Sequence, residues 1–144
     1  IGAWISYLEK LIGEPDERTY FVGHSIGCQT ILRYLEKLPD SKRVGGCVFV
    51  APWFTLMNLE KDEEKVAEPW IKTPIDFIKV NQHTDYFMAI FSDNDDVVPL
   101  NNREMFAQKL SAKTILENGK GHFSGGDGIT ELTSVLSAVL EISS

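Results

Sequence analysis

The sequence lacks a long apolar run, a cluster of basic residues and a set of paired cysteines. No hydrophobic stretch approaches the ~18 residues that a membrane-spanning helix needs, and no signal peptide is visible. Its 14 Lys and Arg residues face 21 Asp and Glu residues, which gives a net charge of −7. Nucleic acids and anionic membranes attract basic patches, so the composition argues against either as a partner.

The two cysteines, Cys28 and Cys47, fit neither a disulfide framework nor a metal-binding motif. One falls in an expected helix and the other in an apolar strand. We expect both to be reduced and buried as small hydrophobic side chains, as is typical of a cytoplasmic protein. The aspartates Asp93, Asp95 and Asp96 offer oxygen ligands, but a calcium loop of the EF-hand type needs a longer run that ends in Glu. No metal site is therefore predicted.

What the chain does contain is enough apolar material for one core, 43% of 144 residues. Residues 44–51 and 86–92 form apolar runs that are typical of strands buried on both faces. Shorter strands are expected at 19–22 and 113–117, and helices at 1–12, 25–38, 101–110 and 129–142. This alternation predicts a single α/β domain, a three-layer sandwich in which helices cover both faces of a mostly parallel sheet.

The segment 52–84 interrupts this alternation. It is rich in aromatic residues and holds three prolines, which is too much structure for a linker. We expect it to be an excursion of the domain 1–144 over the carboxyl edge of the sheet, where open α/β folds bind ligands. Its acidic cluster 60–65 is expected to be an exposed helix face or loop. Four aromatic side chains either line a substrate pocket or pack the excursion onto the sheet: Trp53, Phe54, Trp70 and Phe77.

The pentapeptide GHSIG, residues 23–27, matches the pattern G-x-S-x-G between an expected strand and an expected helix. A serine on such a tight turn is lifted out of the sheet, and the flanking glycines leave room for neighbouring elements. The N-terminus of the following helix directs backbone N–H groups and a positive dipole towards developing negative charge. Ser25 is therefore a candidate nucleophile, and its alternative role is that of a helix cap.

A serine hydroxyl needs a base to take its proton, and the sequence offers three histidines. His24 lies inside the elbow and is expected to point away from Ser25 in a structural role, although it is also a candidate for substrate binding. His83 is expected in a surface loop. His122 follows the last expected strand in a Gly-rich segment, which places it at the same sheet edge as Ser25. It is the candidate base, unless it is only a histidine of a flexible loop.

The base in turn needs a carboxylate that fixes its tautomer and stabilises the imidazolium. The run DNDDVVPL follows the expected strand 86–92, so one of its aspartates would lie at the carboxyl end of a strand. The alternative is an ordinary acidic turn. Ser, Asp and His thus occur in that order along the chain, each after a separate strand, and together they predict a catalytic triad.

At these residues the sequence resembles the α/β-hydrolases, and more narrowly the small serine hydrolases grouped with retinoblastoma-binding protein nine and its bacterial relatives. The likeness extends over residues 19–125 in the stretches FVGHSIGCQTILRYLE, VFVAPW, TPIDFIKVNQ, AIFSDNDDVVP and GKGHFS. Residues 73–82 are the narrowest marker, because most hydrolases carry a different cap there. The resemblance implies hydrolysis of small carboxylic esters or amides through an acyl-enzyme, without a metal or an organic cofactor.

The same resemblance assigns roles to individual residues. It implies Ser25 as nucleophile, His122 as base and Asp95 as acid. Asp96 is the runner-up because the acidic run is ambiguous by one position, and Asp93 is less favoured because it lies closer to the strand.

The resemblance also implies an earlier strand ending in a His-Gly-type loop that supplies one N–H of the oxyanion hole. These residues do not include it, so we expect N-terminal strands of the sheet to be absent from this chain. The N–H of Ile26 is the other expected donor.

A second interpretation is a hydrolase-fold module for protein interaction with a vestigial triad, although the pocket-protein motif L-x-C-x-E is absent. A thioesterase or acyltransferase would use the same elbow.

Overall fold

A four-stranded parallel sheet forms the centre of the computed structural model, which describes all residues 1–144. The strands lie side by side in chain order: β1 (Tyr20–His24), β2 (Gly46–Val50), β3 (Phe87–Ser92) and β4 (Lys113–Glu117). Neighbouring strands are parallel throughout, so the carboxyl ends of all four meet at one edge of the sheet. The four expected strands are confirmed, with small shifts at their ends.

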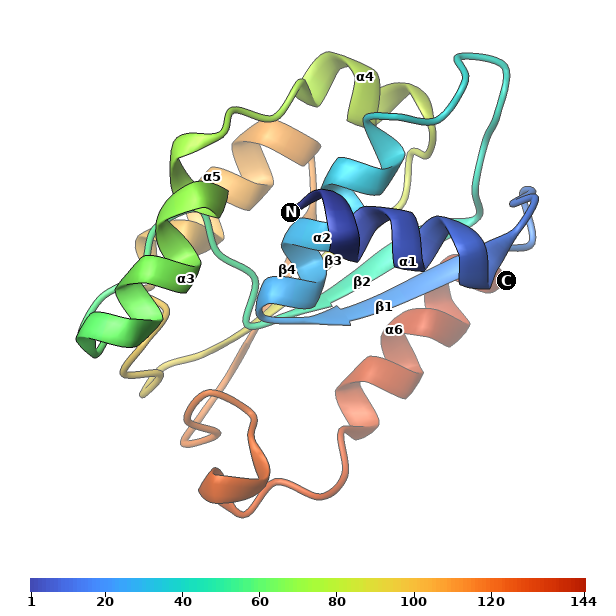
Figure 1. Cartoon of the computed structure of the whole chain (residues 1–144). Coiled ribbons are helices and arrows are strands. Elements are labelled where there is room, and N and C mark those ends of the chain that lie inside the picture. The colour runs from blue at the N-terminus through green and yellow to red at the C-terminus, as the bar shows by residue number, and fades with distance from the viewer.

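Helices cover both faces of the sheet and make the predicted three layers (Figure 1). On one face α2 (Ile26–Leu35) packs against β1, and α5 (Asn101–Leu110) packs against β3 and β4. The first helix, α1 (Gly2–Ile12), lies against α2. On the opposite face α6 (Thr133–Ser143) packs against β1 and β2. The prediction of an α/β sandwich with a parallel sheet is therefore confirmed.

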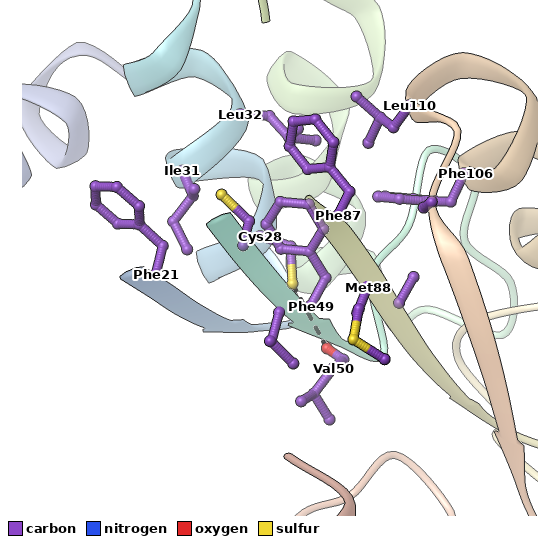
Figure 2. Packing of buried hydrophobic residues seen from close by; sticks show 14 of the residues in the cluster. Phe21, Cys28, Ile31, Leu32, Phe49, Val50, Phe87, Met88, Phe106 and Leu110 are labelled. Carbon is purple, nitrogen blue, oxygen red and sulfur yellow. Dashed lines mark hydrogen bonds between the residues drawn. The ribbon is translucent and has the colours of Figure 1, made fainter. Parts of the chain in front are cut away.

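Aromatic rings and small side chains fill the layer between the sheet and the helices α2 and α5 (Figure 2). Phe49 of β2 is completely buried and meets the ring of Phe106 edge-on, with centroids 6.0 Å apart. Cys28 and Cys47 are also fully buried and unpaired, as predicted. Burial raises the pKa of both thiols, and the Cys28 thiol donates to the carbonyl oxygen of Val50 at 3.6 Å. Both cysteines thus act as packing residues.

Residues 52–84 contain two further helices, α3 (Lys61–Lys72) and α4 (Phe77–Gln82). The acidic cluster 60–65 is exposed and supplies the first turn of α3, where negative charge is favourable at a helix N-terminus. α4 begins after Asp76, whose carboxylate accepts two backbone N–H groups at 3.1 Å. In Figure 1, α3 and the loop that follows β4 lie beyond the same end of the sheet.

A buried arginine of α2 holds this excursion on the core. Arg33 is 3% exposed, and its guanidinium donates to the carbonyl oxygens of Trp70 and Thr73 at 2.7 Å and of Pro74 at 3.3 Å. These carbonyls lie at or just beyond the C-terminal end of α3, where a helix leaves carbonyl groups without intrahelical partners. Arg33 thereby fixes the position of α3 relative to the sheet.

His83 is buried, so the prediction of a surface loop was wrong. Its side chain is 0% exposed, and its Nδ1–H donates to the carbonyl oxygen of Lys42 at 2.7 Å. Its own carbonyl oxygen accepts the N–H of Val44 at 2.8 Å. These bonds connect the end of α4 to the segment that enters β2. The partners lie about forty positions earlier, so the polar local sequence gives no sign of them.

β1 lies at one edge of the sheet and pairs only with β2. Its residue Val22 is 54% exposed on the face that α6 covers only in part.

No helix in the structure combines the length and the apolarity that crossing a membrane would require.

Candidate active site

Ser25 occupies the turn between β1 and α2 in a backbone conformation that is rare for a residue with a Cβ. Its φ is 51° and its ψ is −119°, and its side chain makes no capping hydrogen bond to α2. Its N–H donates to the carbonyl oxygen of Val50 at 2.9 Å, which ties the turn to the end of β2. The geometry is that of a half-buried side chain on a strained elbow, and it does not support the helix-cap alternative.

The two glycines of the motif differ in how much space a side chain would have at their positions. A Cβ at Gly23 would lie 2.7 Å from the side chain of Ile31 and 3.0 Å from the backbone nitrogen of Cys28. Gly27 has no neighbouring atom within 4 Å of such a position. Close packing therefore requires glycine before the serine, whereas the expectation that the second glycine also makes room for a neighbour was wrong for this chain.

Ser25, His122 and Asp95 form one continuous chain of hydrogen bonds. Nε2 of His122 lies 3.0 Å from Oγ of Ser25, and its Nδ1 lies 2.9 Å from Oδ2 of Asp95. The network assigns the proton to Nδ1, which donates to the carboxylate and leaves Nε2 free to accept the serine proton. The other oxygen of Asp95 accepts the N–H groups of Val97 and Val98 at 2.9 Å each. The carboxylate side chain is 2% exposed, so the pair is largely shielded from solvent.

The three aspartates of the acidic run have different surroundings. Only Asp95 contacts His122. Asp93 accepts the N–H of Gly119 at 2.7 Å, and Asp96 is exposed at the surface. No group of three or more His, Cys, Asp or Glu side chains lies together in a way that could hold a metal ion.

Three successive side chains at the end of β3 and just after it hold the loop that carries the histidine. Oxygens of Asp93, Ser92 and Asn94 accept the N–H groups of residues 119, 120 and 121 at 2.7, 3.0 and 2.8 Å. We call this set of bonds the amide clamp. Sequence reasoning missed it, and the only signal was a run of short polar side chains directly after a buried strand. The clamp brings His122 to the level at which it meets Asp95.

Asp127 supports the same loop from its other side. Its Oδ2 accepts the N–H of His122 at 3.1 Å, and it also accepts the hydroxyl of Ser124 at 2.6 Å and its N–H at 3.0 Å. These bonds, above all the one from the Ser124 hydroxyl, hold the pKa of the Asp127 carboxyl below its usual value. The residues on either side of His122 both have positive φ, 54° at Gly121 and 55° at Phe123. The path of this loop is therefore tightly specified.

An apolar cavity of about 450 Å³ opens beside Ser25. Its wall combines Ile26 and His122 with the loop after β2 and with one side of α3, including Val66. The backbone N–H of Ile26 belongs to the first turn of α2, where amides have no intrahelical acceptor. Two larger hollows, of about 590 and 700 Å³, do not have Ser25 in their walls, although the smaller shares Leu56, Leu59 and Ala67 with the cavity at Ser25.

The structure brings only one of the four candidate aromatic residues to this cavity. Trp53 lines it, and its indole Nε1–H donates to Oγ of Ser25 at 3.3 Å. Phe54 and Phe77 instead pack edge-on against each other, with ring centroids 5.3 Å apart. Together with Trp70 they line a separate hollow of about 370 Å³. Of the two alternatives for these three residues, the structure agrees with packing, because they join the excursion to α2 and α5 and do not line the cavity at Ser25.

His24 makes its side-chain hydrogen bond to the loop of His122 and none to Ser25, which agrees with a structural role. Its Nε2–H donates to the carbonyl oxygen of His122 at 2.7 Å. The two imidazole rings lie 5.0 Å apart. His24 does not line the cavity beside Ser25, so the structure gives it a contact with the loop that carries His122 and none with that cavity.

A parallel sheet with a serine elbow after one strand, and with an aspartate and a histidine after later strands, defines the class of α/β-hydrolases. The model of the family described as serine hydrolase matches residues 1–141. The chain belongs to this serine hydrolase family, and its membership supports a hydrolase activity.

Individual relatives agree with this assignment. The Bacillus subtilis (strain 168) protein YdeN is 30% identical over 133 residues, which are 92% of this chain and 67% of YdeN. The serine hydrolase RBBP9 of Rattus norvegicus is 24% identical over 137 residues, 95% of this chain and 69% of RBBP9. The crystal structure of the B. subtilis ydeN gene product has a TM-score of 0.86 at 26% identity, covering 96% of this chain and 73% of that one.

Proposed function

We propose that the protein hydrolyses small carboxylic esters or amides through an acyl-enzyme, with Ser25 as nucleophile, His122 as base and Asp95 as acid. The observation that carries the proposal is the unbroken hydrogen-bond chain, with distances of 3.0 Å from Ser25 to His122 and 2.9 Å from His122 to Asp95. A histidine held in this tautomer accepts the serine proton at Nε2, and the carboxylate stabilises the imidazolium that results.

In the first half of the reaction Oγ of Ser25 attacks the carbonyl carbon while its proton moves to Nε2 of His122. The negative charge that develops on the carbonyl oxygen lies at the N-terminus of α2, where the N–H of Ile26 is a donor. The leaving alcohol or amine departs with the proton from His122. In the second half, water loses a proton to His122 and attacks the acyl carbon, and Ser25 leaves with that proton.

The cavity beside the serine supports a substrate with an apolar group. Its wall contains two carboxylates, Asp62 and Glu63 at the start of α3, and no Lys or Arg. An acyl or leaving group with a carboxylate at that end would meet like charge, so neutral small esters and amides fit better.

The two unpaired buried thiols support a reducing compartment, and we include the cytoplasm in the proposal.

A fluorophosphonate probe tests the nucleophile directly. We expect it to label the protein at Ser25, as located by peptide mass analysis, and to leave the Ser25→Ala variant unlabelled. Absence of labelling, under conditions in which a known serine hydrolase reacts, would contradict the proposal and favour the interaction module.

A pair of neighbouring substitutions tests the acid. Asp95→Asn should lower kcat by about 10⁴, because the amide leaves the histidine in the wrong tautomer. Asp96→Asn is the matched control and should leave kcat within a few-fold of the parent protein, since Asp96 is exposed and does not contact His122. The reverse pattern would identify Asp96 as the acid.

A further inference from the structure

The indole of Trp53 contacts the atom that performs the proposed chemistry. Its Nε1 lies 3.3 Å from Oγ of Ser25, and the side chain is 2% exposed. An indole N–H can only donate, and a serine hydroxyl has one proton and two acceptor positions. His122 accepts that proton, and Trp53 occupies one acceptor position. The other lone pair of Oγ remains free for a carbonyl carbon.

The loop that presents Trp53 is held by two buried amide side chains. Gln29, 2% exposed, donates from Nε2 to the carbonyl oxygen of Trp53 at 2.5 Å. Asn102, 0% exposed, accepts the N–H groups of the two residues that follow Trp53 at 2.7 and 3.1 Å. Burying a polar side chain is unfavourable unless it is hydrogen-bonded, and here two such side chains fix one loop.

The same loop begins with a strained residue. Ala51 directly follows β2 and has a φ of 44°, a left-handed value that is uncommon for a residue with a Cβ. Its N–H donates to the carbonyl oxygen of Ile90 at 2.9 Å, so the strain occurs at a residue still joined to the sheet. Strain of this kind persists only where the surroundings determine the conformation strongly. The direction in which the chain leaves β2, and with it the position of Trp53, is therefore fixed.

We propose that Trp53 is a catalytic residue whose indole N–H stabilises negative charge on Oγ of Ser25, chiefly when Oγ is the leaving group in deacylation. This rests on the proposed acyl-enzyme mechanism. In that step water has attacked the acyl carbon, the bond from the acyl carbon to Oγ breaks, and its electron pair moves onto Oγ. The proton held by Nε2 of His122 then transfers to Oγ. A donor at Oγ stabilises the incoming electron pair before that transfer is complete.

In acylation the same hydrogen bond has two opposing effects on the rate. A donor to Oγ helps the hydroxyl to lose its proton, but it also withdraws electron density from the oxygen that must attack. These two effects offset each other, whereas in deacylation only the stabilisation remains. Removal of the N–H should therefore slow deacylation more than acylation, which a role in packing alone does not predict.

The test compares Trp53→Phe with the matched control Trp70→Phe. Both replace a buried indole by a benzyl group, but Trp70 does not line the cavity at Ser25, and its indole nitrogen makes no hydrogen bond to Ser25, His122 or Asp95. Stopped-flow hydrolysis of a p-nitrophenyl ester of a short acyl chain gives the acylation rate constant from the burst and the deacylation rate constant from the steady state.

For Trp53→Phe we expect the deacylation rate constant to fall about 3- to 10-fold, the worth of one net hydrogen bond, with a smaller change in acylation. The acyl-enzyme should then accumulate and be visible by intact mass. Trp70→Phe should leave the ratio of the two rate constants unchanged. Equal losses in both steps for Trp53→Phe, or a change confined to KM, would overturn the proposal and reduce Trp53 to a wall of the cavity. An ester that gives no acyl-enzyme with the parent protein, together with no fluorophosphonate labelling, would overturn the proposed function itself.

Discussion

Replacing Ser25 by glycine should make the protein more stable than replacing it by alanine, although neither variant retains the proposed nucleophile. Ser25 has a φ of 51° and a ψ of −119°, and a residue with a Cβ held in such a sparsely populated region costs of order 1–3 kcal/mol. Glycine adopts this conformation without that strain, but fixing its backbone costs about 0.5–1 kcal/mol more than fixing alanine. Taken at the middle of the two ranges, the difference leaves Ser25→Gly more stable than Ser25→Ala by about 1 kcal/mol.

The comparison isolates the backbone because both variants lose the hydrogen bonds of Oγ with His122 and Trp53. At about 3 °C per kcal/mol for a chain of this size, thermal unfolding should place the glycine variant about 3–4 °C above the alanine variant. Ala107, which is exposed in the regular helix α5, provides the control. Ala107→Gly should lower the stability by about 1 kcal/mol.

A glycine variant that melts at or below the alanine variant, while Ala107→Gly shows its ordinary penalty, would refute the reasoning. The positive φ of Ser25 would then carry no free-energy cost. The expected result instead implies that the elbow stores strain, which the rest of the fold has to offset.

Three further predictions follow from the surroundings of the site and the core. Asn94→Ala should lower kcat about 10- to 100-fold at nearly unchanged KM in steady-state assays, because the amide clamp loses one of its acceptors and the loop of His122 is displaced. Cys28 and Cys47 should not react with a thiol reagent until the protein unfolds, as titration with and without denaturant would measure, because burial raises the pKa of both thiols. The lowered pKa of Asp127 means that its contribution to stability is present above the unfolded-state value and is lost as the pH falls through the folded-state value, below about 4. Denaturant unfolding at several pH values should therefore show a weaker loss of stability in acid for Asp127→Asn.

The sequence was sufficient for those parts of the molecule that depend on short-range patterns. The apolar runs predicted the strands because a strand buried on both faces needs continuous apolar residues. The serine elbow and the histidine after the last strand followed from their order relative to those strands. The choice among the aspartates did not follow in this way. It rested on a family resemblance, since three carboxylates within four positions are equivalent until their contacts are known.

What the sequence did not reveal depends on contacts between distant segments. His83 appears polar and exposed in its local context, but its ring is covered by a segment about forty positions earlier. Phe54 and Phe77 are aromatic residues of the kind that line apolar pockets, yet their rings pack on each other. The contact of Trp53 with Ser25 joins residues 28 positions apart, and nothing in the local pattern distinguishes Trp53 from Trp70.

The amide clamp has a consequence for how this enzyme family can diverge. Residues 119–121 are held through their main-chain N–H groups, so the clamp constrains the path of the backbone and not the side chains that it carries. Lys120 contributes its amide to the clamp, and its ammonium group takes no part in any hydrogen bond there. Mutation can therefore alter charge and size at position 120, two residues before His122, while the histidine keeps its place. Ser92, Asp93 and Asn94 lack that freedom, because the oxygen atoms that accept these hydrogen bonds belong to their side chains. In this set of hydrogen bonds, the donor Lys120 can therefore change its side chain, whereas the three acceptor residues cannot.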